Sequence, residues 1–462
     1  MKTTLRKDSR LSFPVLLLLG LTACGGGSGG GSSTPPMADS AYMIGGMVTG
    51  LTGSGLVLQN NAAGDLAVTA AGPFSFAAAL AKGAAYAVTV KTQPSSPTQN
   101  CVVYNGSGTA GSAIDGNLEV ICSTVGRFAY AANAADNTVS VYAIDSTTGA
   151  LAAVGTAVAT GTSPYAIAAR PDGQYLYVGN RISSSISVYA VNAASGALTA
   201  IPGSPFATGV DPQALAFDPS GAHLYVANNG SDNLSAYAVN VGTGALLPIA
   251  TAYATGTGPS AVSVSSDGAW VFVANNGGSD DISVFAITAG TGALTPAAGS
   301  PFAAGGNPHS LVLTPIPGPY DYGGAYLFTA NFDGTGSTIS GFSLDWNTGA
   351  LTALTGSPFA VPVSNYIGTD RTGADLYVTT GAGVVGYRLD EGTLTALAGF
   401  PVASGSNAYS STVDPSNQFL YVANDGSASI SGYKLDSNGG GLSAVPGSPF
   451  AAGSHPDFIA IL

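Results

Sequence analysis

Short apolar runs separated by polar turn residues recur along the chain from residue 127 onward. One unit contains LYVAN at residues 224–228, NLSAY at 233–237 and TGAL at 243–246. Each unit holds four runs of strand length, and none has the 3.6-residue spacing of an amphipathic helix. Units of several short strands, joined by turns rich in Gly, Asn and Pro, predict the blades of a β-propeller.

Two sequence landmarks give the number of blades. The Leu of a Gly-x-Leu element recurs at residues 151, 198, 246, 294, 351, 394 and 442. The Asn that ends the second run of each unit recurs at 133, 180, 228, 275, 331 and 424, with Thr380 in its place once. We therefore expect seven blades, and we expect each Asn to satisfy backbone groups at its strand end.

The two ends of the repeat array indicate how it closes. The first unit lacks the strand that precedes the Tyr-rich run in the other six, while the chain ends in residues 455–461, which match that strand. The C-terminal strand should therefore complete blade one and remove the open sheet edges. This predicts a closed seven-bladed propeller over residues 126–462.

A smaller β unit is expected over residues 41–123. It contains seven strand-length runs, and residues 86–90 alternate with a period of two, as half-buried strands do. An Ig-like or transthyretin-like β-sandwich fits this length. Cys101 and Cys122 form a pair without a Cys-x-x-Cys arrangement, so a structural disulfide is favoured over redox chemistry.

The N-terminus carries an export signal. Four basic side chains precede an apolar run over residues 11–23, too short for a permanent membrane span. The run ends in Leu21-Thr22-Ala23-Cys24, which resembles a bacterial lipobox; the alternative is an ordinary signal peptide with a chance Cys. The resemblance implies removal of residues 1–23, acylation of Cys24 (diacylglycerol, palmitate), a Gly/Ser-rich tether over 24–40, and transport to the outer membrane, because no Asp follows Cys24.

Charge argues against nucleic acid as a partner. Of the 462 residues 8% are charged, with 12 basic and 25 acidic side chains. Four basic residues and one acidic residue lie within residues 1–23, so the mature chain has 8 against 24, a net charge of −16. Such a surface repels phosphate backbones, and its simplest role is solubility.

The repeats resemble a known family. LYVAN at 224–228 and LYVAN at 420–424, with the Pro-Asp-Gly and Thr-Gly-Ala-Leu elements, are similar to the seven-bladed lactonase (6-phosphogluconolactonase-like) and YVTN-repeat propellers. The resemblance implies His, Arg and Glu at the channel mouth of the enzymes. Residues 258–261 (Gly-Pro-Ser-Ala) carry neither Arg nor His, and Glu391 is the one Glu of residues 126–462. The family's catalytic set is therefore mostly absent.

Candidate site residues follow from propeller connectivity, which brings the starts of the inner strands to one face. The residue after each Pro-equivalent position defines a ring whose members are Tyr165, Gln213, Ser260, His309, Tyr366, Tyr409 and Asp457. Around the ring we place Arg181, Asn229, Asn276, Asp333 and Asp425. The rim suits a carbohydrate or peptide; the alternative is that these side chains only fill a narrow channel.

His309 and Asp457 are the candidate proton-transfer pair for catalysis. No metal-ligand spacing, nucleophile elbow or cofactor motif is present, so no metal and no cofactor are expected. The Pro-rich segment 314–324 is expected on the face away from the ring, as a tolerated insertion or a partner contact.

Three functions remain open. The first is a lipid-anchored, monomeric binding or scaffolding module of the cell envelope, on its periplasmic or surface face, with a glycan, a peptide or an envelope protein as ligand. The second is a lactonase-type hydrolase with an altered site. The third is a structural surface protein. The composition favours the first.

Overall fold

The computed structural model describes residues 42–462 except 52, 96–98, 105, 112–117, 125–127, 251, 315–325, 333–335, 363, 382, 391 and 437–439. The expected signal peptide, Cys24 and the tether lie outside the described residues, as do Asp333, Glu391 and nearly all of the Pro-rich segment. The described chain is all-β. Within it, no helix has the length and apolar character needed to cross a membrane.

The first eight strands form two sheets, in the orders β4-β1-β8-β6 and β3-β2-β5-β7. Side chains from both sheets share one core, in which Ile44, Leu56, Leu58 and Val120 are fully buried. The strands are β1 (Tyr42–Thr49), β2 (Leu56–Asn60), β3 (Ala63–Val68), β4 (Gly72–Leu80), β5 (Ala85–Thr92), β6 (Gln99–Tyr104), β7 (Ser107–Thr109) and β8 (Leu118–Thr124).

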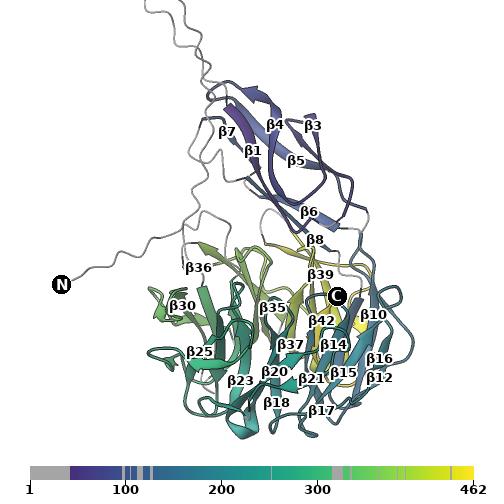
Figure 1. Ribbon diagram of the computed structural model, residues 1–462, viewed down its shortest axis with the longest axis vertical. Helices are drawn as coiled ribbons and strands as arrows, with labels where there is room; N and C mark the ends of the chain where they lie inside the picture. The colour runs from purple at the N-terminus through teal and green to yellow at the C-terminus, as the bar shows by residue number, and fades with distance from the viewer. Residues whose placement is uncertain are drawn as a thin grey trace, which may run out of the picture. The chain divides into compact units, whose positions relative to one another are not determined.

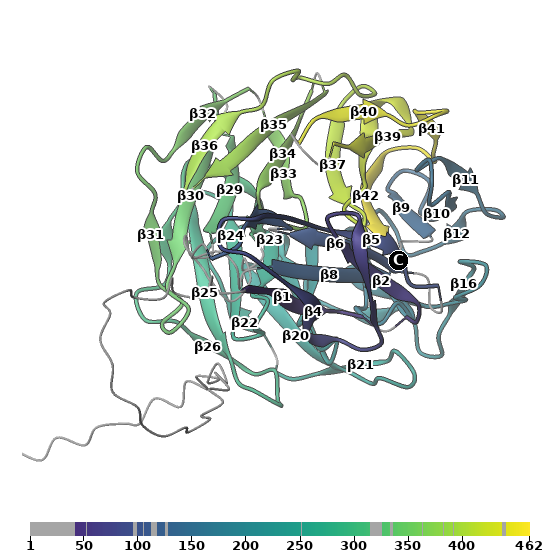
Figure 2. The same cartoon turned by 90° about the horizontal axis from the view of Figure 1, so that it is seen from above.

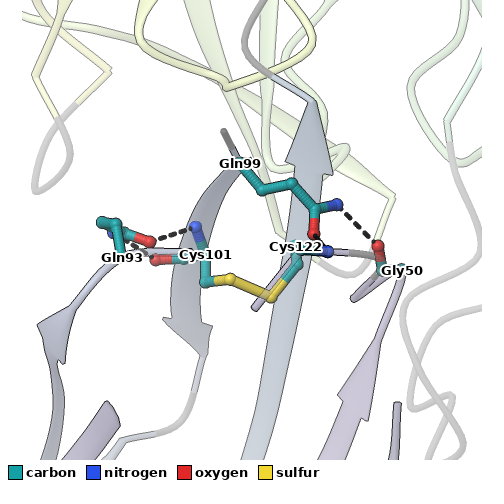
Figure 3. The surroundings of a disulfide bond; sticks show 6 residues. Gly50, Gln93, Gln99, Cys101 and Cys122 are labelled. Atoms are coloured by element: carbon teal, nitrogen blue, oxygen red, sulfur yellow. Dashed lines mark hydrogen bonds between the residues drawn. A yellow bond between two sulfur atoms is a disulfide. The ribbon is translucent and has the colours of Figure 1, made fainter. Parts of the chain in front are cut away.

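The expected disulfide joins Cys101 of β6 to Cys122 of β8, which are directly opposed in the antiparallel pair. Two glutamines satisfy backbone groups beside it (Figure 3). The carboxamide of Gln93 accepts from Cys101 N at 2.7 Å and donates to Cys101 O at 3.0 Å. The buried Gln99 donates to Gly50 O at 2.8 Å. The side-chain amides thus take the place of ladder partners at the sheet edge.

The remaining strands of the described chain form seven sheets, which follow one another around a ring (Figures 1 and 2). Blade one holds β42 (Pro456–Ile461), β9 (Phe128–Asn133), β10 (Thr138–Ile144), β11 (Leu151–Ala153) and β12 (Val158–Ala159). Blade two holds β13 (Pro164–Ala169), β14 (Tyr175–Asn180), β15 (Ser185–Val191), β16 (Leu198–Ala200) and β17 (Phe206–Ala207). Blade three holds β18 (Pro212–Phe217), β19 (His223–Asn228), η1 (Asn229–Ser231), β20 (Asn233–Val239), β21 (Leu246–Pro248) and β22 (Tyr253–Ala254).

The other four blades repeat this plan. Blade four holds β23 (Pro259–Val264), β24 (Trp270–Asn275), β25 (Asp281–Ile287), β26 (Leu294–Pro296) and β27 (Phe302–Ala303). Blade five holds β28 (Pro308–Leu313), β29 (Tyr326–Phe332), β30 (Ser337–Leu344), β31 (Leu351–Ala353) and β32 (Phe359–Val361). Blade six holds β33 (Ser364–Thr369), β34 (Asp375–Thr380), β35 (Gly383–Asp390) and β36 (Thr393–Ala396). Blade seven holds β37 (Ala408–Val413), β38 (Phe419–Asn424), η2 (Asp425–Ser427), β39 (Ser429–Leu435), β40 (Leu442–Ala444) and β41 (Phe450–Ala451).

Each blade is an antiparallel meander with its first strand innermost. In blade one the innermost strand is β42, which pairs with β9, so the two ends of the repeat array share one sheet. The second strand of every blade is buried on both faces. This explains the continuous apolar runs of these strands, because a strand covered on both sides needs no polar alternation.

Neighbouring blades are joined by a repeated tyrosine contact. The hydroxyl of Tyr130, in the second strand of blade one, donates to Gly196 O in the outer turn of blade two at 3.0 Å. The same bond recurs from Tyr177 to Gly244 O, Tyr225 to Gly292 O, Tyr377 to Gly440 O and Tyr421 to Gly149 O. The last of these joins blade seven to blade one. These glycines have positive φ, which the turn needs and which favours Gly.

The strand-ending asparagines bond differently from the expectation. Asn180 Nδ2 donates to Ser185 Oγ at 3.1 Å and Ser187 Oγ at 3.0 Å, both on the third strand of its blade. The partners are therefore mainly side chains rather than backbone groups, because the amide points across the sheet. A Cβ at Gly161 would lie 2.7 Å from the Asn180 carboxamide, so only Gly fits there.

The same pairing explains the exceptional blade six. In the six blades with the Asn, Gly stands three residues before the inner strand begins, at 161, 209, 256, 305, 405 and 453. In blade six the second strand ends in Thr380, and the equivalent of the Gly is Val361. The shorter polar side chain thus occurs together with an apolar side chain in place of the Gly.

The tyrosine contact predicts a measurable contribution to ring closure. Tyr421→Phe should lower the free energy of unfolding by about 1–2 kcal/mol, because it removes one hydrogen bond and leaves a carbonyl without its donor. Tyr225→Phe, which removes the same bond between blades three and four, is the matched control and should cost the same. Urea denaturation measures both; an unchanged midpoint for Tyr421→Phe would contradict the role given to the contact.

Candidate functional site

The inner strand of every blade begins with a β-bulge at the same position. In blade two, Pro164 pairs with Asn180 and Ala166 with Gly179, so Tyr165 has no partner in the ladder. The corresponding irregularity occurs in all seven inner strands. A bulge turns its extra side chain out of the sheet. The residues at this position are Tyr165, Gln213, Ser260, His309, Asn365, Tyr409 and Asp457, and we call the end of the channel that carries them the ring face.

One member of the predicted ring needs correction. In blade six Ser364 pairs with Thr380, as Pro164 pairs with Asn180, so the bulged residue is Asn365 and not Tyr366. That blade has neither the Pro at the start of its inner strand nor the Gly three residues earlier, so both landmarks for counting are missing. Asn365 Nδ2 donates to Ala408 O of blade seven at 2.8 Å.

Tyr366 lies one residue farther along the strand and contributes to an aromatic plug, which we define as Tyr165, Tyr366, Tyr409 and Phe458. The ring of Phe458 packs edge-on against Tyr165 at 5.1 Å, Tyr366 at 5.6 Å and Tyr409 at 6.0 Å between centroids. The hydroxyls of Tyr165 and Tyr409 share a short hydrogen bond. The positions equivalent to Tyr366 and Phe458 in the other five blades are Ala or Ser, so these two rings fill space that the other strands leave open.

The plug lies beside a small cavity of about 140 Å³ on the channel axis. Gln213, Ser260 and His309 line it, together with Tyr366 and Phe458. The volume equals that of about five water molecules. It can therefore accept part of one small ring, but not a polymer.

Arg181 is the cation of the ring face, and an ion pair already holds it. Its Nε lies 2.7 Å from Asp211 Oδ1, and its guanidinium lies 4.6 Å from the centroid of the Tyr165 ring. Burial by itself would lower the pKa of Arg181. The hydrogen bond to Asp211 and the charge of Asp211 raise it by more, so the pKa lies above its ordinary value. Gln213 Nε2 donates to the other oxygen of Asp211 at 3.3 Å. The positive charge is thus neutralised before any ligand binds.

Asp457 is the titratable group that stands out. Its residue is 8% exposed, and burial followed by the neighbouring charge of Asp425 raises its pKa to about 7, against the opposing effects of Arg181 and His455. Asp425 is itself fixed by Asn407 Nδ2 at 2.7 Å and His455 Nδ1 at 2.7 Å. Around neutral pH the ring face therefore carries a carboxyl group that is partly protonated.

His309 belongs to a separate group of amides. Asn229 Nδ2 donates to Asn276 Oδ1 at 3.3 Å, and Asn276 Nδ2 lies 3.3 Å from His309 Nδ1. Burial lowers the pKa of His309, which favours the neutral form of its imidazole. The charged groups that act on Asp457 are on blades one, two and seven, while His309 is on blade five. The two candidate catalytic residues thus lie in different hydrogen-bonded groups, and no contact among the described residues joins them as a proton-transfer pair.

Comparison with known proteins identifies the family of the chain. The family model described as "Lactonase, 7-bladed beta-propeller" matches residues 89–204, 115–257 and 324–455, more than half of the chain. The chain belongs to this seven-bladed lactonase family. No curated protein matches the chain in sequence.

Solved structures of this lactonase type are similar in fold. A proposed 6-phosphogluconolactonase from Bacteroides uniformis superposes with a TM-score of 0.62 at 17% identity, over 72% of this chain and 99% of that one. A second from Bacteroides fragilis gives 0.62 at 18% identity, over 76% and 99%. The periplasmic gluconolactonase of Pseudomonas aeruginosa gives 0.61 at 17% identity, over 72% and 98%. At these identities the likeness establishes the fold alone.

The titratable residues at the ring face differ from the His, Arg and Glu that the family resemblance led us to expect. Arg181 is paired with Asp211, His309 contacts the amide of Asn276, and the acid with a raised pKa is Asp457. Among the described residues, no three His, Cys, Asp or Glu side chains are grouped so that they could hold a metal ion.

Three site residues escaped the sequence analysis: Asn365, Phe458 and His455. The sequence does contain a signal for His455. The residue before each Pro-equivalent position has a left-handed backbone, a conformation in which Asn, Asp and His are enriched. The described members of this position are Ser163, Asp211, Gly258, Asn307, Asn407 and His455, with φ between 51° and 61°. Alignment of the repeats on this position places His455 at the ring face, at the position that Asp211 and Asn407 occupy in their own blades.

The raised pKa of Asp457 predicts a pH-dependent stability. Because the folded state holds this proton more tightly than the unfolded state, the free energy of unfolding falls as pH rises from about 4 to about 7. Asp457→Asn should remove that loss and stabilise the protein above pH 7, by about 4 kcal/mol at most, with little effect near pH 4. Asp390→Asn, which removes an exposed carboxylate of β35, is the control. A difference between Asp457→Asn and wild type that stays constant from pH 4 to 8 would exclude the raised pKa.

Proposed function

We propose that the ring face binds an uncharged, hydroxyl-rich small molecule of the sugar or sugar-lactone type, and that the protein acts as a binding module of the cell envelope. The observation that carries this proposal is the pairing of Arg181 with Asp211, since the described residues of the ring face then offer no unpaired Arg or Lys to a phosphate or carboxylate. What surrounds the cavity is a set of neutral hydrogen-bonding groups beside aromatic rings. This combination suits hydroxyl-bearing rings.

A second candidate, hydrolysis of a bound lactone, is favoured by Asp457. A carboxyl group whose pKa is about 7 can act as a general base at neutral pH. Ionised Asp457 would take a proton from water while the water oxygen bonds to the lactone carbonyl carbon. The ring C–O bond then breaks, and the departing oxygen receives the proton to give the hydroxy acid. The lactonase family membership is consistent with this chemistry.

Binding and hydrolysis can be tested with the same probes. Saturation-transfer NMR on the mature chain should detect D-glucono-1,5-lactone and not 6-phosphogluconate. Gln213→Leu should weaken lactone binding at least threefold, because it removes an amide from the cavity wall. Gln174→Leu, in an exposed turn at the other end of the channel, is the matched control.

Hydrolysis is followed in the same samples as gluconate formation above the uncatalysed background. Turnover that is abolished by Asp457→Asn would establish that the protein is a lactone hydrolase. Binding of the lactone without turnover would support the role of a binding module. Preference for 6-phosphogluconate over the lactone, or failure of both to bind, would contradict the proposal.

We further propose that residues 41–123 form an Ig-like or transthyretin-like spacer, that β42 closes a ring of seven blades over residues 126–462, and that acylated Cys24 anchors the chain in the outer membrane. A short apolar run ending at Cys24, followed by a Gly/Ser-rich stretch, supports the anchor.

The anchor gives a direct prediction. Expressed in a diderm bacterium from the full-length gene, the wild-type protein should fractionate with membranes and should release from them only in detergent. Cys24→Ser should appear in the soluble envelope fraction, because an unacylated chain has nothing to hold it in the bilayer. Cys101→Ser, which removes a different thiol, should stay membrane-bound. Membrane retention of Cys24→Ser would show that acylation of this residue is not the anchor.

A further inference from the structure

A second, larger recess lies at the opposite end of the channel. We call this end the turn face, because it carries the turns between the first and second strands of the blades, such as residues 370–374. The recess has a volume of about 440 Å³, within the usual range for small-molecule sites. Tyr366 lines both this recess and the cavity of the ring face. The aromatic plug therefore stands between two separate spaces.

The recess contains an unpaired cation. Of the four arginines in the described part of the chain, Arg170, Arg181 and Arg388 form ion pairs with Asp172, Asp211 and Asp375. Arg371 forms none. Its guanidinium makes only two long contacts to backbone oxygens, Asp414 O and Val413 O, each at 3.4 Å. In a chain with so few basic residues, a guanidinium that lines a recess and forms no ion pair is a specific feature.

Two carboxylates lie nearby, and both are already satisfied. The carboxylate of Asp414 acts on Arg371 through its charge, but its oxygens accept from Ser416 N at 3.0 Å, Gln418 N at 2.8 Å and Phe419 N at 2.7 Å. Asp370 lines the recess and is 5% exposed. Its oxygens accept from Asp375 N at 3.0 Å, Thr372 N at 3.2 Å and Asn417 Nδ2 at 3.3 Å, with a further bond from the Thr372 hydroxyl. The Asp370 carboxylate therefore bonds to groups of the turn over residues 370–375 and to Asn417, and it is not paired with Arg371.

The remaining wall is apolar over the larger part of its surface, and Ser and Thr side chains, among them Ser263, Thr314 and Ser411, lie between the apolar ones. Val264, Val312, Leu313 and Val413 contribute aliphatic surface, and Trp346 contributes an indole. A ligand that fills this recess must therefore present an apolar body to the wall and an anionic end to Arg371. A guanidinium binds a carboxylate through two parallel hydrogen bonds, which gives such a ligand a defined orientation.

We propose that the turn face carries a binding site for an amphipathic organic acid, with Arg371 as its carboxylate-binding residue and the recess as the pocket for its apolar part. This site is distinct from the ring face and does not depend on the function proposed for it.

The test uses octanoate as the probe and isothermal titration calorimetry on the mature chain. Octanoate should bind, and acetate and 1-octanol should bind at least tenfold more weakly, because each lacks one of the two recognised parts. Arg371→Ala should reduce octanoate affinity at least tenfold. Lys434→Ala, which removes an exposed cation of β39 outside the recess, should leave the affinity unchanged.

A second variant fills the pocket without a change of charge. A Cβ at Gly368, which lines the recess, would meet no atom closer than 3.4 Å. Gly368→Leu should therefore fold and should abolish octanoate binding. Failure of octanoate to bind the wild-type chain would overturn the proposal. So would equal affinity for 1-octanol, or an affinity that neither Arg371→Ala nor Gly368→Leu reduces.

Discussion

The hydrogen bond from a second-strand tyrosine to the glycine carbonyl of the next blade is the contact on which the arrangement of the ring depends. The five donors, Tyr130, Tyr177, Tyr225, Tyr377 and Tyr421, are all fully buried. A buried hydroxyl must find an acceptor, and the outer turn of the adjacent blade supplies one at a fixed distance from the axis. Phe272 and Phe328 take the equivalent positions in blades four and five. There, other hydrogen bonds join the neighbouring blades: Trp270 Nε1 donates to Trp346 O of blade five at 2.9 Å, and Ile367 N of blade six donates to Ser310 Oγ of blade five at 3.2 Å.

This constraint also determines where chemistry can occur. With the blades fixed at their second strands, the inner strands converge on the axis, and their bulges turn one side chain per blade toward the ring face. The small residues that follow the bulges leave a channel, which Tyr366 and Phe458 then fill. The result is two separate spaces: a small cavity bordered by Gln213, Ser260 and His309, and a larger recess with an unpaired guanidinium. The two ends therefore favour ligands of different charge.

The repeats made the all-β propeller predictable, because the period, the Gly-x-Leu turns and the strand-ending Asn are local features that recur. The ring positions could be predicted where Pro or the Gly three residues earlier marked the strand start. The prediction failed at Asn365, where both are absent. The aromatic plug and the Asp425–His455 contact could not be predicted, since they join residues 30 to more than 200 positions apart in the chain. Such contacts depend on the rotation of one blade relative to another, which no single repeat encodes.

The central claim is that the ring face holds a carboxyl group that titrates near neutral pH beside a neutralised cation. The most direct measurement is the pKa of Asp457 by carboxyl ¹³C NMR, with the resonance assigned by its absence in Asp457→Asn. The account predicts a midpoint of about 7. A midpoint near 4, the ordinary value for Asp, would contradict it, and with it the argument that Asp457 can serve as a base at neutral pH.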